Sequence, residues 1–129
     1  MAHRAFLLAS AVGELKKILL DFNNKHGALL SAIVSRVGTP IAWNIPKDVT
    51  VENFCALAAT ILGASEVIYA GMSKPAPKRI LIESNEGVLV VSGIGSKAFV
   101  AAMFPAMSDK IDEGMEDIGQ QIIDVLKSQ

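Results

Sequence analysis

The single cysteine is the most reactive side chain in this sequence, and its surroundings decide whether it could act as a nucleophile. Cys55 lies in an apolar segment, and the histidines that could activate it, His3 and His26, belong to other segments. A catalytic thiol needs a nearby base, so we interpret Cys55 as a buried structural thiol. A lone cysteine forms no internal disulfide, which fits a reducing compartment and predicts a cytoplasmic protein.

A glycine-rich turn at Gly93–Ser96 is the one segment that resembles a phosphate-binding loop. Such a loop needs a helix to follow it, with a lysine at a fixed spacing. Lys97 is present, but the residues after it have the pattern of a strand. We therefore predict a hairpin turn, and the sequence gives no sign that the chain is itself a GTPase.

Acidic residues cluster near the C-terminus and could in principle bind a divalent cation. Their spacing is not that of a calcium loop, and the histidines lie elsewhere. We expect a solvated acidic face, with a partner-facing patch as the alternative, and no metal site. The residues concerned are Asp109, Asp112, Glu113, Glu116 and Asp117.

The clustered basic residues are Lys74, Lys78 and Arg79, which could contact an acidic partner or protect the edge of a sheet from pairing. An arginine finger can accelerate GTP hydrolysis, which makes Arg4, Arg36 and Arg79 formal candidates. Nothing in their spacing selects one of them. The net charge of −1 and the lack of a long basic run argue against nucleic-acid binding.

The composition is unusually apolar for a chain of 129 residues, which is the length of one domain, residues 1–129. Hydrophobic residues make up 51% and charged residues 19%, against about 25% charged in a typical soluble domain. Either the chain enters a membrane or its monomer keeps apolar surface for a partner. The charge-free stretch between Glu52 and Glu66 is too short to span a bilayer. The apolar residues of Ala5–Gly13 continue into a charged helical pattern, so we expect no membrane insertion.

Hydrophobic periodicity and turn residues predict three helices and five strands in the order α-β-β-α-β-β-β-α. Most links between strands are short, which predicts a mainly antiparallel sheet flanked by the helices, an α/β (α+β) sandwich. Gly38 can supply a positive φ in the first hairpin turn, Gly87 could do so in the second, and Ser108 could cap the last helix. The predicted helices are Ala5–Asn24, Val51–Met72 and 109–128, and the predicted strands are Ala28–Arg36, Ile41–Ile45, Lys78–Glu83, Val88–Val91 and Lys97–Phe104.

The second predicted helix is apolar on nearly every side, which indicates burial against more than one surface. One side can cover the sheet, and the other needs a different covering. The stripe that we identify on this helix consists of Val51, Phe54, Cys55, Ala58, Ile61, Leu62, Ser65 and Ile68.

Three segments, His26–Ile45, Phe54–Ile68 and Lys78–Met103, together resemble the roadblock/dynein-light-chain family, including its prokaryotic members that regulate Ras-like GTPases. Apolar strands separated by glycines carry this resemblance, which covers almost the whole chain. The chain departs from the family pattern at the first hairpin turn. Many relatives have an acidic residue there, whereas Ser35–Thr39 contains none.

The resemblance implies a homodimer, or a heterodimer with a paralogue, in which the second helices pack together and the strands after them pair. It also implies a regulator or adaptor that binds a small Ras-like GTPase, with no enzyme activity and no cofactor of its own. Partner contacts could include Lys74, Lys78 and Arg79. The predicted dimer interface consists of Phe54, Ala58, Ile61, Leu62, Ser65, Ile68, Ile80, Leu81 and Ile82.

A small-molecule sensor domain is the alternative, because a five-stranded sheet flanked by helices can also bind metabolites. Such a domain should keep a pocket with a few convergent polar groups. The predicted core is instead aliphatic and contains small residues, Ala28, Ala32, Ala42 and Ala98, which favour close packing. An independent enzyme is the weakest hypothesis, because no acid–base or nucleophile–base pair has a meaningful spacing.

Overall fold

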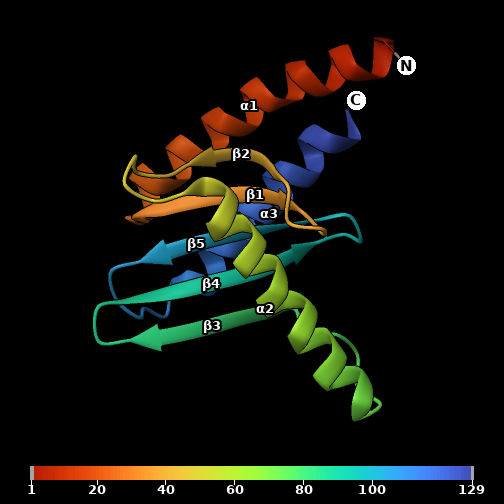
Figure 1. Ribbon diagram of the computed structural model, residues 1–129. Helices are drawn as coiled ribbons and strands as arrows, with labels where there is room; N and C mark the ends of the chain where they lie inside the picture. Colours follow the sequence, from red (N-terminus) through yellow and green to blue (C-terminus); the bar gives the residue numbers. More distant parts are fainter. Residues whose placement is uncertain (1, 129) are drawn as a thin grey trace.

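The computed structural model describes residues 2–128, with side chains described from residue 11 onward, and it confirms the predicted order of elements (Figure 1). Arg4 and His3 lie outside the residues whose side chains are described. The elements are α1 (Ala2–His26), β1 (Leu30–Ser35), β2 (Pro40–Asn44), α2 (Val51–Gly71), β3 (Arg79–Ser84), β4 (Gly87–Ile94), β5 (Ala98–Phe104) and α3 (Ile111–Lys127).

The five strands form one sheet in the order β2-β1-β5-β4-β3, and every neighbouring pair is antiparallel. The last strand of the chain, β5, therefore lies at the centre of the sheet, between β1 and β4. The strands that flank α2 in the sequence, β2 and β3, form the two opposite edges. The connection through α2 consequently crosses the whole sheet.

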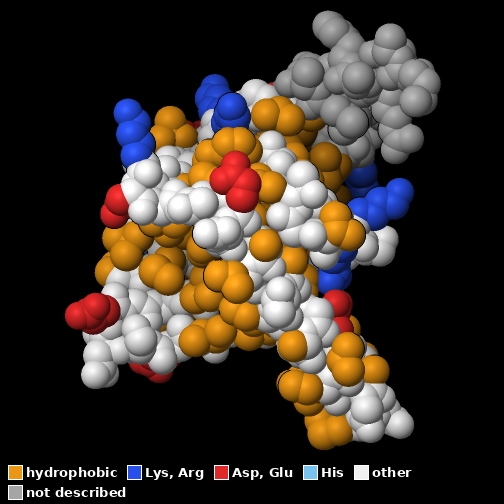
Figure 2. All heavy atoms as spheres, viewed as in Figure 1, with side chains coloured by type: hydrophobic (Ala, Val, Ile, Leu, Met, Phe, Trp, Pro, Cys, Tyr) orange, Lys and Arg blue, Asp and Glu red, His pale blue; other side chains and the backbone are white. Residues whose placement is uncertain are grey.

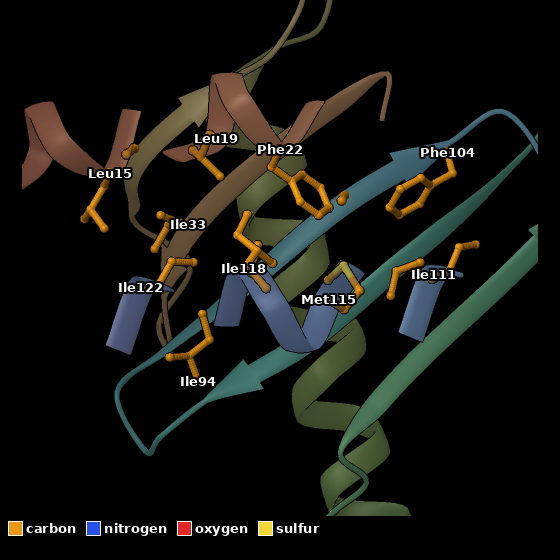
Figure 3. Packing of buried hydrophobic residues seen from close by; sticks show 14 of the residues in the cluster. Leu15, Leu19, Phe22, Ile33, Ile94, Phe104, Ile111, Met115, Ile118 and Ile122 are labelled. Carbon is orange, nitrogen blue, oxygen red and sulfur yellow. The ribbon is translucent and has the colours of Figure 1, made fainter. Parts of the chain in front are cut away.

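One face of the sheet is covered by α1 and α3, whose apolar side chains close a continuous core (Figure 3). Alternate residues of β4, Val88 and Val90, point into this core. The spacing of the α3 side chains follows the period of a helix with one apolar face. The contributions of the two helices are Leu15, Leu19, Phe22, Ile111, Met115, Ile118 and Ile122, each at most 4% exposed.

The opposite face carries only α2, which crosses it diagonally (Figure 1). Cys55, Ala58 and Leu62 are its buried residues. They form a second and smaller core with side chains from the central strands, namely Ala32, Val34, Val91, Phe99 and Ala101. The small side chains of Ala32 in β1 and Ala101 in β5 let the helix approach the sheet closely.

The first hairpin turn fixes the position of α2 through Gly38. This residue has a φ of +93°, as its place in the turn predicted. A Cβ atom on it would lie 3.2 Å from Ala56 Cα and 3.4 Å from Ala59 Cβ. The turn therefore presses directly against the helix, where no larger side chain fits without movement.

Two local predictions are wrong. Gly87 does not have a positive φ, because β3 and β4 are joined through Asn85 and Glu86 alone. Gly87 is instead constrained by packing, since a Cβ there would lie 3.0 Å from the Phe104 carbonyl oxygen. The last helix begins at Ile111, with Lys110 in the cap position, so Ser108 does not cap it. The Ser108 hydroxyl accepts a hydrogen bond from the Lys110 amide in the preceding turn.

Candidate interaction surface

The C-terminal half of α2 extends beyond the body of the molecule (Figures 1 and 2). The last buried residue of the helix is Leu62, and nothing in the described chain covers its final turns. Val67 is 72% exposed and Met72 is 55% exposed. An apolar helix end in water has little to stabilise it on its own, because most helical stability comes from tertiary packing. We call residues 66–72 the projecting end of α2.

A second apolar stripe runs along one side of α2, next to the side that packs on the sheet. Its members follow at alternating intervals of three and four residues, which is the spacing of a helix–helix seam. Leu57 is 64% exposed and Ile68 is 61% exposed. We call this stripe the α2 seam, and its residues are Phe54, Leu57, Ile61, Ala64 and Ile68.

On the α2 face, beside the seam, the end of the sheet at β3 is left largely uncovered, and residues 81–84 are exposed (Figure 1). Ile80 and Ile82 pair with Val91 and Leu89, so they point to the α2 face. Ile82 is 45% exposed, and the outer edge of β3 has no neighbouring strand within the described chain. Figure 2 shows hydrophobic side chains spread over this part of the face. The seam, the projecting end and β3 together form a surface that combines a helix stripe with an open sheet edge.

Several residues predicted for a dimer interface have another role. Ala58 and Leu62 are 2% and 3% exposed because they pack on the chain's own sheet, so they are not free to meet a partner. Ser65 is half-buried, and its hydroxyl donates to the Leu62 carbonyl at 2.7 Å. Leu81 pairs with Val90 and therefore points to the α3 face, so it can meet a partner only through edge pairing of β3 and not through the α2 surface.

The remaining predicted interface residues lie on the open surface: Phe54, Ile61, Ile68, Ile80 and Ile82. Leu57, Ala64 and Met72 also lie on this surface, although they are not among the predicted interface residues. The alternating spacing from Phe54 to Ile68 is a signal that could have identified the first two.

Of the three predicted partner-contact bases, two are bound to α3. The Arg79 guanidinium donates to Asp112 Oδ1 at 2.9 Å and to Glu116 Oε1 at 3.0 Å, and its side chain is only 11% exposed. The Lys78 ammonium also pairs with Glu116. These hydrogen bonds, first from Lys78 and then from Arg79, lower the pKa of the Glu116 carboxyl. Of these three bases, Lys74, in the loop after α2, is the one that is exposed and makes no ion pair with residues 11–128.

An ion pair marks the point where α2 leaves the sheet. Arg36, at the end of β1, donates to Glu66 Oε2 at 2.9 Å, and both side chains are about one third exposed or less. Its second terminal nitrogen lies 3.4 Å from the Gly95 carbonyl oxygen. A shallow cavity of about 390 Å³ lies beside this pair, bordered by Gly63 and Ser96. Because Arg36 and Arg79 both bind acids of their own chain, neither is positioned as a free arginine finger.

The remaining chemical candidates have structural roles. Cys55 is fully buried, as predicted, and burial, followed by the charge of Glu52, raises the pKa of its thiol to about 11. The segment Gly93–Ser96 forms the end of β4 and the turn to β5, so the hairpin prediction is correct. No group of three histidine, cysteine or acidic side chains within the described residues could hold a metal ion.

The length and hydropathy of α2 make it a candidate membrane span, which the short charge-free stretch between Glu52 and Glu66 does not predict. Counted as a whole helix of 21 residues, α2 is long and apolar enough to cross a bilayer, even though its charge-free stretch is short. Core helices can be equally long and apolar, and here Cys55, Ala58 and Leu62 pack on the sheet. The high hydropathy of α2 therefore reflects the same excess of apolar surface that the seam and the projecting end display.

Known proteins share both the sequence pattern and the fold of this chain. A sequence model of the Roadblock/LC7 domain matches residues 14–104. None of the curated proteins matches the chain. Among solved structures, Myxococcus xanthus MglB superposes with a TM-score of 0.85 at 11% identity, covering 91% of this chain and 90% of that one. The gliding protein MglB from Thermus thermophilus has a TM-score of 0.83 at 14% identity, covering 92% and 93%. An MglB with a tetrameric arrangement has a TM-score of 0.83 at 14% identity, covering 92% and 91%. At these identities the likeness shows a shared fold.

Proposed function

The chain belongs to the Roadblock/LC7 domain family, and from this membership we propose that it is a homodimeric adaptor that binds and regulates a small Ras-like GTPase. The observation that carries the proposal is the open surface formed by the α2 seam, the projecting end and β3. A regulator of this kind works through its surfaces, and this chain has a large apolar surface that its own fold leaves uncovered.

A second copy of the chain is the partner that fits the open surface best. The surface needs two things, a helix to cover the seam and a strand to complete the edge of the sheet. A two-fold related copy presents both together, in the same relative positions. An exposed apolar patch of this kind typically marks a protein interface. The solved structure of an MglB with a tetrameric arrangement, which shares this fold, is consistent with assembly of such domains.

The GTPase contact would lie outside the dimer seam. On the outer side of α2, small residues, Ala56, Thr60 and Gly63, lead to the exposed Val67. Lys74, just beyond the helix, supplies a free positive charge for an acidic partner segment. Binding there would act by favouring one conformation of the switch segments of the GTPase, because a ligand shifts a conformational equilibrium by its differential affinity. This adaptor role requires no nucleophile, cofactor or metal from the chain.

The proposal also concerns the identity of the second chain in the dimer and the location of the protein in the cell. A paralogue with the same seam and edge could replace the second copy, so the dimer could also be a heterodimer. The free, buried Cys55 thiol fits a reducing compartment, which supports a cytoplasmic location.

The sensor alternative receives less support. Ligand pockets are typically about 300–1,000 Å³ and largely enclosed. The cavity of about 390 Å³ beside Arg36 is a shallow depression on the flank of α2. Its polar groups, Arg36 and Glu66, are already paired with each other.

Light scattering across a dilution series tests the dimer directly. We expect twice the mass of the chain at high concentration and dissociation, if any, only on strong dilution. A monomer throughout would leave the open surface without its proposed partner. If the dimer is found, titration with a purified Ras-like GTPase loaded with GDP or with a non-hydrolysable GTP analogue tests the second part. Absence of binding in both nucleotide states would refute the GTPase role while leaving the dimer intact.

A further inference from the structure

The two sides of β3 carry different chemistry along an otherwise short strand. Ile80 and Ile82 point to the α2 face, whereas Arg79, Leu81 and Glu83 point to the α3 face. Towards α3, the strand therefore begins with a positive charge and ends with a negative charge, with one leucine between them.

A two-fold axis restricts how this strand can pair with its own copy. If two sheets join edge to edge into one continuous sheet, residues that lie opposite each other must point to the same face. For an antiparallel pair, this condition requires one residue of the strand to face its own copy across the two-fold axis. The axis cannot lie level with the midpoint between two successive residues of the strand. Within Arg79–Ser84, only Leu81 and Ile82 are central enough for five residues of each copy to pair inside the strand.

The side chains distinguish these two registers. Centred on Ile82, the pairing places Glu83 opposite the partner's Leu81 and leaves Arg79 beyond the last pair. Centred on Leu81, the pairing places Glu83 opposite the partner's Arg79, twice in each dimer. It also places Ile80 opposite the partner's Ile82. Opposite charges and apolar pairs facing each other across strands stabilise a sheet, so the register centred on Leu81 is favoured.

We propose that two copies of the chain pair through β3 in the register centred on Leu81, with Glu83 as the residue that selects this register and this partner. The inference rests on the proposed homodimer and adds the identity of the residues that meet across it. Because the charges are arranged so that the strand complements itself, a paralogue without this pattern would pair less well.

The ion pairs of the monomer support this role for Glu83. Glu83 is exposed and makes no ion pair with residues 11–128. Arg79, in contrast, is fixed by Asp112 and Glu116, and Lys78 lies beside it with 73% of its side chain exposed. In the dimer, the partner's Glu83, which lacks a counter-charge in the monomer, would join an existing charge network at the start of β3, in which Lys78 and Arg79 already face Asp112 and Glu116.

Disulfide cross-linking measures the register directly, since a disulfide needs Cα atoms about 4.4–6.8 Å apart. Leu81→Cys should form a covalent dimer on mild oxidation, and Ile82→Cys alone should not. A mixture of Ile80→Cys and Ile82→Cys chains should cross-link to each other. Cys55 can remain, because it is buried, and circular dichroism verifies that each variant folds. Cross-linking of Ile82→Cys in place of Leu81→Cys, or of both variants equally, would overturn the register but not the dimer.

A charge reversal tests the role of Glu83 without any cysteine. Glu83→Lys places like charges opposite each other twice in the dimer and should weaken association about tenfold or more. The matched control is Glu86→Lys, which makes the same charge change in the β3–β4 turn, outside the paired residues. Equal effects of the two substitutions would show that net charge matters and that the register does not. If the chain without substitutions is a monomer, the proposed dimer is refuted, and the register is refuted with it.

Discussion

The two faces of the sheet solve the problem of burial in different ways. On the α1/α3 face, each helix has one apolar side, and together they close the core within a single chain. On the α2 face, one helix that is apolar on nearly all sides covers only part of the sheet and then extends beyond it. The apolar surface of α2 therefore exceeds what its own sheet can cover. The first face closes within the chain, and the second leaves the apolar surface on which the proposed dimer rests.

The sharpest way to test this contrast is to shorten equivalent side chains on the two faces. Ile118→Ala, in the closed core, should lower the free energy of unfolding by about 2–5 kcal/mol, because it removes fully buried atoms and leaves a cavity. The midpoint of urea unfolding measures this loss. The shift should not depend on protein concentration.

The matched control, Ile68→Ala, changes a residue that is 61% exposed in the monomer. Its effect should appear only through association, so the shift of the midpoint should grow as the protein is concentrated. A large loss of stability that is independent of concentration would contradict the division of the two faces.

A charge placed in the α2 seam should separate association from folding. Ile68→Asp would bury an unpaired carboxylate in the dimer, which should weaken association by about a hundredfold or more. The monomer should fold normally, since the residue lies beyond the sheet. Light scattering gives the dissociation constant, and Thr60→Asp, on the outer side of the helix, is the control. If Thr60→Asp weakened the dimer as strongly as Ile68→Asp, the interface would not lie on the seam side of α2.

The contact between the first hairpin turn and α2 can be tested at Gly38. Gly38→Ala forces a Cβ into a positive-φ position against the helix and should cost about 1–3 kcal/mol of stability. Gly63→Ala is the matched control, because its Cβ would meet no atom within 4 Å and the change should stabilise the helix slightly. Urea unfolding of both variants compares them. Stabilisation by Gly38→Ala would show that the turn does not press on the helix.

The smallest expected effect concerns the ion pairs that bind β3 to α3. The pKa of Glu116 is lower in the folded chain than in the unfolded chain. Its contribution to stability is therefore present above its ordinary pKa and is lost as the pH falls through the lowered value. Glu116→Gln should flatten the acid side of a plot of melting temperature against pH. Glu113→Gln, at an exposed position without an ion pair among the described residues, should leave the plot unchanged, and identical plots for the two variants would contradict the assignment.

The order of elements could be predicted because local signals agree with the fold. Periodicity identified the helices, and Gly38 marked a turn that its φ confirms. The start of the last helix was misplaced, because Ser108 has the side chain of a cap yet bonds within the preceding turn. In such cases the sequence contains two compatible local structures, and packing against the rest of the chain selects one.

The residues of the open surface were harder to predict for a physical reason. A helix that is apolar on every side does not reveal which side faces the sheet, so Ala58 and Leu62 were assigned to a partner when they belong to the core. Likewise, the pairing of Arg79 with Asp112 and Glu116 joins segments far apart in the sequence. Only the packing of α3 against β3 in the folded chain reveals that the Arg79 guanidinium is already paired with these two carboxylates.

In mechanical terms, α2 is a beam supported at one end. Its support is the contact with Gly38 and the ion pair between Arg36 and Glu66, and its free arm is the projecting end beyond Glu66. Arg36 also reaches the Gly95 carbonyl oxygen, so two hairpin turns meet at the pivot. A small tilt there would move Val67, Ile68 and Met72 together, in one direction. A molecule that binds these turns would therefore change the fit of the proposed dimer without touching the residues of its interface.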